Sequence, residues 1–373
     1  MRMRRLLLLI GWFLLCGLDA QTASMDGDTI ASGHSETDSL HQPRKLSWLR
    51  RVVRGFSEID ENYIEPQHYN YSVMVQMINS YDVYQLRGEN GQTLTFAPSP
   101  TVKVGPYAGW RWLFFGYTVD VKNLNFSSSS RKQAIDLSLY SSQIGVDLFY
   151  RRTGSDYKIR DVKLGTHRMS SLMEGQPFDG LSVGITGFNL YYIFNHKRFS
   201  YPAAFAQSTC QKISCGSWMA GIGYTRNSLD FDYEKLQDLM NEHSVTHEEK
   251  LDSSLMFRKV KYYDYNISGG YAYNWVFARN FLFCASASLL LAYKHTAGDV
   301  GVDQGFSFSK FNVNGIGRFG LVYNNIRWYA GANAIVYANT YKTARFSANN
   351  VFGNIYVYVG YNFGLRSQYK KKK

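Results

Sequence analysis

Apolar and polar residues alternate with a period of two along most of the chain after Tyr71. The clearest segment, 263–275, sets one mainly apolar series against one mainly polar series: Tyr263, Tyr265, Ile267, Tyr271, Tyr273 and Trp275 against Asp264, Asn266, Ser268 and Asn274. Successive side chains of a β-strand point to opposite faces of the sheet, so this pattern predicts strands with one apolar and one polar face. The segments 280–295, 326–341 and 352–365 repeat the pattern.

The length of these segments separates two classes of β-protein. Strands of soluble proteins average about five or six residues, whereas a tilted strand that crosses a membrane needs about 9–11. The segments 263–275 and 280–295 are longer, and in 280–295 aromatic residues lie at both ends of the apolar face with aliphatic residues between them. That arrangement is typical of a lipid-facing surface. We therefore predict an all-β fold, a transmembrane antiparallel β-barrel of about 12 strands, within a range of about 10–14.

The connections between strands predict how the barrel is oriented. We expect strands at 71–87, 101–109, 112–123, 134–150, 156–166, 181–195, 215–229, 257–275, 280–295, 311–323, 326–341 and 352–365. Toward the C-terminus, tight turns at 276–279 and 324–325 alternate with long loops at 230–256, 296–310 and 342–351. Barrels of this class place short turns in the periplasm and long loops outside the cell. Both ends of the barrel are therefore expected in the periplasm.

The N-terminus has the three parts of a secretory signal peptide. Basic residues at 2, 4 and 5 precede an apolar run, Leu6–Leu15, and Ala20 provides a small residue for cleavage. The changes in composition that follow predict a signal peptide at 1–20, a disordered leader at 21–45, a periplasmic helix and lead-in segment at 46–66, the transmembrane barrel at 67–365 and a basic tail at 366–373.

Two segments outside the wall are of interest. The stretch 46–56 has helical spacing of apolar residues with arginines on the other side, so it either packs against the fold or plugs the lumen, or lies on anionic lipid. We expect 46–65 to enter from the periplasm, where it can occlude the lumen. The segment 196–214 contains Pro202, which disfavours a central strand, and is expected to be a periplasmic excursion.

Composition narrows the classes of partner and cofactor. The formal net charge is +12, but the signal peptide and a four-lysine tail carry part of it. Dispersed charge on an exported barrel is a poor basis for nucleic-acid binding, so no nucleic-acid partner is expected. Three cysteines remain after cleavage, and their spacing matches no zinc motif. Cys210 and Cys215 are either bridged or free, and we expect no cofactor.

The last strand carries a resemblance to known proteins. Its sequence, Tyr358-Val359-Gly360-Tyr361-Asn362-Phe363-Gly364-Leu365, resembles the C-terminal assembly signal of outer-membrane barrels. The resemblance implies that the barrel-assembly machinery reads Gly360, Phe363 and Leu365, although the tail 366–373 departs from the pattern. With the sequences at 56–66 and 197–205, the chain resembles over 46–365 a family of Bacteroidota outer-membrane barrels, domain of unknown function 4421. That family implies a fold and a location in the cell outer membrane, and supplies no catalytic residues.

The residues that could carry chemistry are scattered. His167, His243, His247 and His295 fall in or beside outer loops, and no G-x-S-x-G motif accompanies them. His243 and His247 are four apart and could hold a metal on a helix, but solvated loop histidines are the favoured interpretation. The acidic loop 230–256 either bridges divalent cations to lipopolysaccharide or is a solvated loop. We therefore expect no enzymatic activity.

The charged residues on the polar parity are the remaining candidates. We expect Asp264, Lys294, Arg318, Arg327 and Asp120 to face the lumen, where they either line a narrow channel or form salt bridges in a closed one. The sequence thus predicts an outer-membrane barrel with a structural role or a role as a small-solute channel. An outer-leaflet lipid-modifying enzyme and a soluble secreted β-protein remain alternatives. The expected partners are outer-membrane lipid, lipopolysaccharide and the assembly machinery.

Overall fold

The structure is a computed structural model that describes residues 58–110, 113–117, 119–120, 133–153, 156–164, 167–168, 173–242, 251–298, 311–342 and 346–370. The expected signal peptide, the leader, the helix at 46–56 and the histidines at 243 and 247 lie outside the described residues. No helix in the described ranges is long and apolar enough to cross a membrane.

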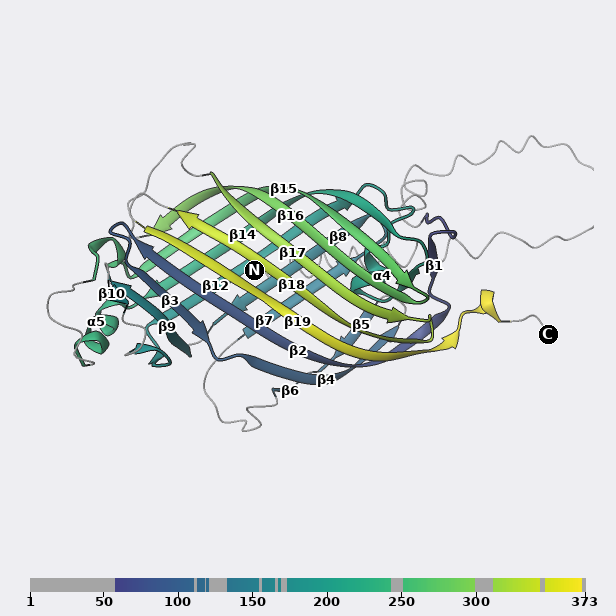
Figure 1. Ribbon diagram of the computed structural model, residues 1–373, viewed down its shortest axis with the longest axis horizontal. Helices are drawn as coiled ribbons and strands as arrows, with labels where there is room; N and C mark the ends of the chain where they lie inside the picture. Colours follow the sequence, from purple (N-terminus) through teal and green to yellow (C-terminus); the bar gives the residue numbers. More distant parts are fainter. Residues whose placement is uncertain are drawn as a thin grey trace, which may run out of the picture.

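Strands dominate the fold (Figure 1). Their bounds are β1 Ile64–Pro66, β2 Tyr69–Gly88, β3 Thr93–Pro98, β4 Thr101–Trp110, β5 Leu113–Gly116, β6 Val119–Asp120, β7 Gln133–Tyr140, β8 Ile144–Arg152, β9 Tyr157–Leu164, β10 His167–Arg168, β11 Pro177–Phe178, β12 Leu181–Ile193, β13 Thr209–Gln211, β14 Cys215–Phe231, β15 Lys259–Ala278, β16 Phe281–Gly298, β17 Phe311–Asn324, β18 Trp328–Lys342 and β19 Phe346–Leu365. The helical elements are α4 Tyr201–Phe205, α5 Tyr233–Glu242, η1 Ser253–Leu255 and η3 Ser367–Tyr369.

The strands close into one antiparallel barrel. Along the wall the order is β2, β4, β5 with β6, β7, β8, β12, β14, β15, β16, β17, β18 and β19. β19 then pairs with β2 from Phe346↔Gly88 to Leu365↔Tyr69, which joins the last strand to the first. Closure leaves no unpaired edge in lipid, where each unsatisfied backbone group would cost several kcal/mol, roughly. The structure confirms the predicted all-β transmembrane barrel within the expected range of strand number.

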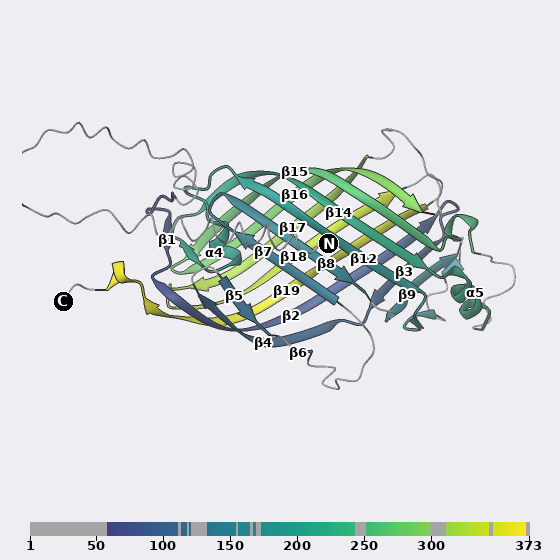
Figure 2. The ribbon, with the colours of Figure 1, turned by 180° about the vertical axis from the view of Figure 1, so that it is seen from behind.

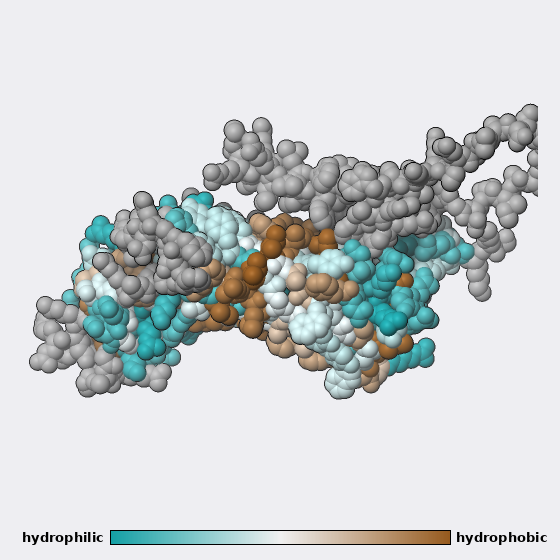
Figure 3. Space-filling model, turned by 90° about the horizontal axis from the view of Figure 1, so that it is seen from above, coloured by the Kyte–Doolittle hydropathy of each residue, from teal (hydrophilic) through white to brown (hydrophobic). Residues whose placement is uncertain are grey.

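The predicted alternation is present in the wall. On β15 and β16, Ile267 and Leu289 point outward with 62% and 69% of their surface exposed, whereas Asn274 and Ser286 are buried inside at 0% and 3%. The outward apolar residues form a hydrophobic band across the middle of the barrel, with hydrophilic surface at both ends (Figure 3). Such a band is the surface that a bilayer covers.

Toward one end of the barrel the two faces of the wall exchange polarity, while the inward and outward parity stays the same. The end that carries α5 also carries the long connections, and we call it the outer end; the opposite end, with Tyr69 and Leu365, is the periplasmic end. Near the outer end of β15, Lys259 and Lys261 point outward while Val260 and Tyr262 are buried, at 0% and 3% exposure. Water replaces lipid beyond the membrane, so the wall becomes polar outside and apolar inside.

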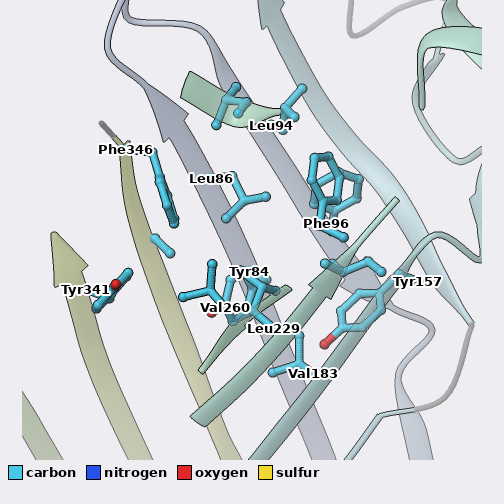
Figure 4. Close-up of a cluster of buried hydrophobic side chains, with 14 of the residues drawn as sticks. Tyr84, Leu86, Leu94, Phe96, Tyr157, Val183, Leu229, Val260, Tyr341 and Phe346 are labelled. Carbon is cyan, nitrogen blue, oxygen red and sulfur yellow. The ribbon is translucent and has the colours of Figure 1, made fainter. Parts of the chain in front are cut away.

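A hydrophobic core fills the outer end of the barrel (Figure 4). Its members include side chains from the inner faces of six or more wall strands: Tyr84, Leu86, Leu94, Phe96, Tyr157, Val183, Leu229, Val260, Tyr341 and Phe346. Leu236 and Met240 of α5 and Leu255 of η1 pack into the same core. Each large apolar side chain buried in this way contributes about 1.5–3 kcal/mol. At this level the interior is therefore apolar and not polar.

Two of the expected strands differ in the structure. The expected strand 134–150 is two strands, β7 and β8, because Ser141 forms a tight turn: its backbone N–H donates to the Ile144 carbonyl at 2.8 Å and its Oγ accepts from the Ile144 N–H at 2.9 Å. The expected strand 156–166 is β9, which pairs not with β8 but with β3. β3 and β4 both pair with β2, β3 near its outer end and β4 along the rest, with Ser99 and Pro100 between them. β3 and β9 therefore extend the wall only at the outer end.

Candidate functional site in the barrel interior

An ion pair crosses the interior below the apolar core. Arg318 on β17 contacts Asp147 on β8 through its guanidinium, and both side chains are 2% exposed. Along the wall β8 and β17 are separated by β12, β14, β15 and β16, so the pair joins opposite sides of the barrel. Ser138 donates its hydroxyl to Asp147 Oδ1 at 2.7 Å, and the Arg318 guanidinium lies 5.2 Å from the centre of the Tyr191 ring.

A second buried pair lies along one side of the wall. Lys294 Nζ is 3.4 Å from Asp264 Oδ2, and the two residues face each other across β15 and β16. Asn314 donates to Asp264 Oδ2 at 2.9 Å, and Lys294 also donates to the Thr340 carbonyl. Asn266 donates to Asp264 Oδ1 at 3.5 Å, so both carboxylate oxygens and the ammonium contact protein groups. The pair therefore holds β15, β16, β17 and β18 together and does not project free charge into a channel.

Aromatic rings occupy the space beside the crossing ion pair. The rings of Tyr140 and Tyr191 lie 5.5 Å and 5.9 Å from that of Tyr201, which comes from α4. Tyr201 donates its hydroxyl to Ser286 Oγ on β16 at 2.9 Å. Edge-to-face and tilted ring pairs of this kind pack densely. The rings thus lie in the lumen between the ion pair and α4.

The segment 194–214 forms a plug in the periplasmic mouth, and α4 lies inside that end of the barrel (Figure 2). Ser200 caps α4 by accepting the Ala203 N–H at 3.2 Å, and Pro202 occupies the first turn, where its missing N–H costs nothing. Asn274 of β15 donates to the Ser200 carbonyl at 2.8 Å, and Gln207 donates to the Tyr358 hydroxyl of β19 at 2.6 Å. The expected periplasmic excursion at 196–214 is thus folded back into the lumen.

Gln211 holds the plug together. Its side-chain oxygen accepts from the Ser200 N–H at 2.8 Å and from Asn274 at 3.1 Å, and its amide nitrogen donates to the Arg198 carbonyl at 2.6 Å. The lead-in residues lie against this segment, because β1 pairs with β13 with Glu65 opposite Cys210. The segment 46–65 was expected to occlude the lumen. Its described part, residues 58–65, packs on the plug, and it is the chain at 194–214 that lies in the mouth.

The other predicted lumen residues fall into two groups. Asp264, Lys294 and Arg318 are buried in the interior. Arg327 is not: it lies in the turn after β17, is exposed, and donates to the outward Tyr361 hydroxyl at 2.6 Å. The turn contains Ile326 at φ 72°, a left-handed conformation that takes the following residue out of the strand's alternation. The side chain of Asp120 lies outside what the structure describes.

The predicted assembly residues lie on the closing strand β19. Gly360 lies under the Tyr329 ring of β18, where a Cβ would come within 2.2 Å of Tyr329 Cζ, so this position has no room for a side chain. Phe363 and Leu365 point outward and are each 41% exposed, and the Phe363 ring lies 5.6 Å from that of Tyr71 on β2. Their recognition by the assembly machinery stays a prediction.

Residues 58–363 match the family described as Domain of unknown function (DUF4421). The chain belongs to this family. No curated protein matches it. Among solved structures, it is similar to the outer membrane protease OmpT of Escherichia coli, with 8% identity, 79% of this chain and 97% of that chain covered, and a TM-score of 0.32. It is also similar to the P. putida toluene transporter TodX, with 8% identity, coverage of 80% and 91%, and a TM-score of 0.23.

In the described ranges of the DUF4421 barrel, no three His, Cys, Asp or Glu side chains come together as a metal site. Cys210 and Cys215 are free, not bridged. Burial raises the pKa of the Cys210 thiol to about 12, which keeps it protonated and unreactive at neutral pH. His196 has its Nε2 2.8 Å from the side-chain nitrogen of Gln143 beside the plug.

The outer end of the DUF4421 barrel is closed by a latch that the sequence did not reveal. Asp252 accepts the Asn90 N–H at 2.8 Å and the Ser254 N–H at 2.9 Å, while Ser254 Oγ accepts the Glu89 N–H at 3.0 Å. Burial alone would raise the pKa of Asp252, but these hydrogen bonds outweigh burial and lower the pKa. The carboxylate ties η1 to the turn between β2 and β3.

Proposed function

We propose that this protein is a closed structural barrel of the outer membrane, and not an open channel. The observation that carries the proposal is the Asp147–Arg318 pair, which joins opposite sides of the wall within the lumen. The two opposite charges compensate each other across the lumen, so the pair leaves no free charge to conduct ions past. This pair therefore favours a role as a scaffold over a role as a small-solute channel.

Two further layers support closure. The hydrophobic core of the outer end lies above the ion pair, and the plug at 194–214 lies below it. A water-filled pore needs a continuous polar path through all three layers. In the apolar layer, Leu86, Leu94 and Phe96 are 0% exposed, so they offer no such path.

The exterior supports residence in a lipid bilayer. Aromatic residues form two rows around the wall, one at each edge of the apolar band. In the outer row the ring centres of Tyr224 and Tyr265 are 5.2 Å apart. In the periplasmic row those of Phe281 and Tyr323 are 5.0 Å apart. Aromatic girdles of this kind lie at the two membrane interfaces, which favours the outer membrane as the location.

Planar-bilayer conductance of the purified protein tests this function. We expect no steady conductance from the full chain, and none after deletion of residues 21–57, because the three closed layers lie within 58–365. An open porin added to the same bilayer is the positive control. Steady ohmic steps from the full chain would overturn the closed-barrel proposal. The same preparation, incubated with phospholipid and lipid A, is expected to release no acyl chain, and turnover would favour the enzyme alternative.

A further inference from the structure

A shallow apolar groove lies on the lipid-facing side of the wall, at the outer edge of the hydrophobic band. Its volume is about 380 Å³, and its lining includes outward side chains of four neighbouring strands: Ile222, Tyr265, Ile267, Leu291, Tyr293 and Phe311. Ile222 and Tyr265 are each 54% exposed, so the groove opens to the bilayer. Pockets of 300–1,000 Å³ are the usual size of a ligand site.

Glycines lower the surface on the membrane side of this groove. Across the wall, Gly269 on β15 and Gly315 on β17 flank Leu289 on β16 in one row. A Cβ added at Gly269 or Gly315 would meet nothing within 4 Å, so the space beside the exposed Leu289 is open. The groove thus continues from the aromatic row toward the middle of the bilayer. That depth suits the acyl chains of a lipid.

Basic side chains lie directly beyond the aromatic row, on the outer side. Arg226 follows Tyr224 by two residues on the same face of β14, about 7 Å farther along the strand. Arg226 faces Tyr263, which in turn faces His295, and Lys261 lies one row farther out. All of these residues share the outward face of the groove. The wall therefore presents positive charge immediately above an apolar depression.

These cations are available for a ligand. Lys259, the next basic residue outward, is paired with Asp230 at 2.8 Å. Arg226 and Lys261, by contrast, have no carboxylate within 4.0 Å in the described part of the chain. The Arg226 guanidinium lies 5.9 Å from the centre of the Tyr263 ring. A guanidinium beside an ammonium favours a phosphate group, which each can bind by charge-assisted hydrogen bonds.

We propose that this face binds a phosphorylated, multiply acylated glycolipid of the outer leaflet. The lipid phosphate lies against Arg226 and Lys261, and acyl chains lie in the groove between Tyr265 and Leu289. A zwitterionic phospholipid offers a compensating ammonium and fits the cationic rim less well. The site rests on the proposed membrane location but not on the closed lumen, so lipid binding and conductance fail independently.

Native mass spectrometry of the purified full chain in detergent tests the site, with bisphosphorylated lipid A as the probe. The double variant R226E/K261E is expected to weaken the apparent affinity by at least about thirtyfold, from the loss of two surface cations near an anionic headgroup. The matched control is R87E/K342E. These two basic residues both lie beside Ser347 at the outer end of β2 and β18, so the control changes the net charge equally at the same end of the barrel.

A second variant tests the groove itself. Gly269→Leu fills the open space without a clash and is expected to weaken lipid A binding while leaving Arg226 and Lys261 intact. Gel-shift on heating checks that each variant has a folded barrel. The proposal is overturned if R226E/K261E binds as the unchanged protein does, if the R87E/K342E control loses as much affinity, or if Gly269→Leu has no effect. Equal binding of phosphatidylethanolamine and lipid A would also overturn it.

Discussion

Replacing Asp147 with Leu leaves the guanidinium of Arg318 in the barrel interior without its carboxylate. Both side chains are 2% exposed, and Arg318 Nε already has no hydrogen-bond partner in the described part of the protein. Removing one partner of a buried ion pair costs about 3–5 kcal/mol, because the remaining charge is left without compensation. We expect Asp147→Leu to lower the free energy of unfolding by about that amount.

The reverse substitution, Arg318→Met, is expected to cost less. A lone carboxylic acid can take up a proton and become neutral, whereas a guanidinium cannot lose one in a protein. The double variant D147L/R318M removes both charges and is expected to unfold within about 1 kcal/mol of the unchanged protein, or to be more stable.

Urea unfolding of the refolded barrel, followed by tryptophan fluorescence and by the gel shift on heating, measures these energies. The coupling between the two sites is the double-variant cost minus the sum of the single costs. The reasoning is refuted if the costs of the single variants simply add, which would mean that the two charges do not interact. It is equally refuted if Asp147→Leu is neutral, within about 0.5 kcal/mol.

Three other predictions concern the wall and its outer end. Leu289 lies on the lipid face near the bilayer centre, so Leu289→Arg is expected to destabilise the barrel folded in vesicles by about 2–4 kcal/mol. Ser228→Arg, on the outward polar end of β14, is expected to cost about 0–1 kcal/mol, and equal costs would contradict the membrane placement. The pKa of Asp252 is lowered in the folded state, so its carboxylate stabilises the fold above its unfolded pKa, and this stability is lost as the pH falls through the folded pKa. Asp252→Asn should therefore flatten the acid side of a plot of unfolding free energy against pH. An unchanged curve would rule out the latch. Gly360→Ala should slow barrel assembly, since its Cβ would meet the Tyr329 ring, and adding Tyr329→Ala should restore the assembly rate. If the double variant stays slow, contact with the Tyr329 ring is not the reason that Gly360 is needed.

The sequence by itself determined the class of fold and the direction of most side chains. A period of two over segments such as 263–275 needs no tertiary information, because adjacent side chains of a strand always point to opposite faces. The outward Ile267 and Leu289 and the inward Lys294 and Arg318 follow from that rule. The sequence also contained the change of polarity at the outer end of β15, where the outward parity becomes basic at Lys259 and Lys261 and the inward parity becomes apolar at Val260 and Tyr262.

The tertiary structure alone decided what fills the barrel. The alternation along β17 predicts that Arg318 points inward. It does not predict that β8 lies opposite β17 across the barrel, so Asp147 could not be inferred as the partner of Arg318. The turn at Ser141 brings Ser138 of β7 opposite Asp147 of β8, although alternation along one unbroken strand would place them on opposite faces. A single left-handed residue, Ile326, moved Arg327 to the surface. The plug at 194–214 depends on contacts such as Gln207 with Tyr358, which join residues far apart in the chain. A closed lumen arises from these long-range contacts, and no local pattern encodes them.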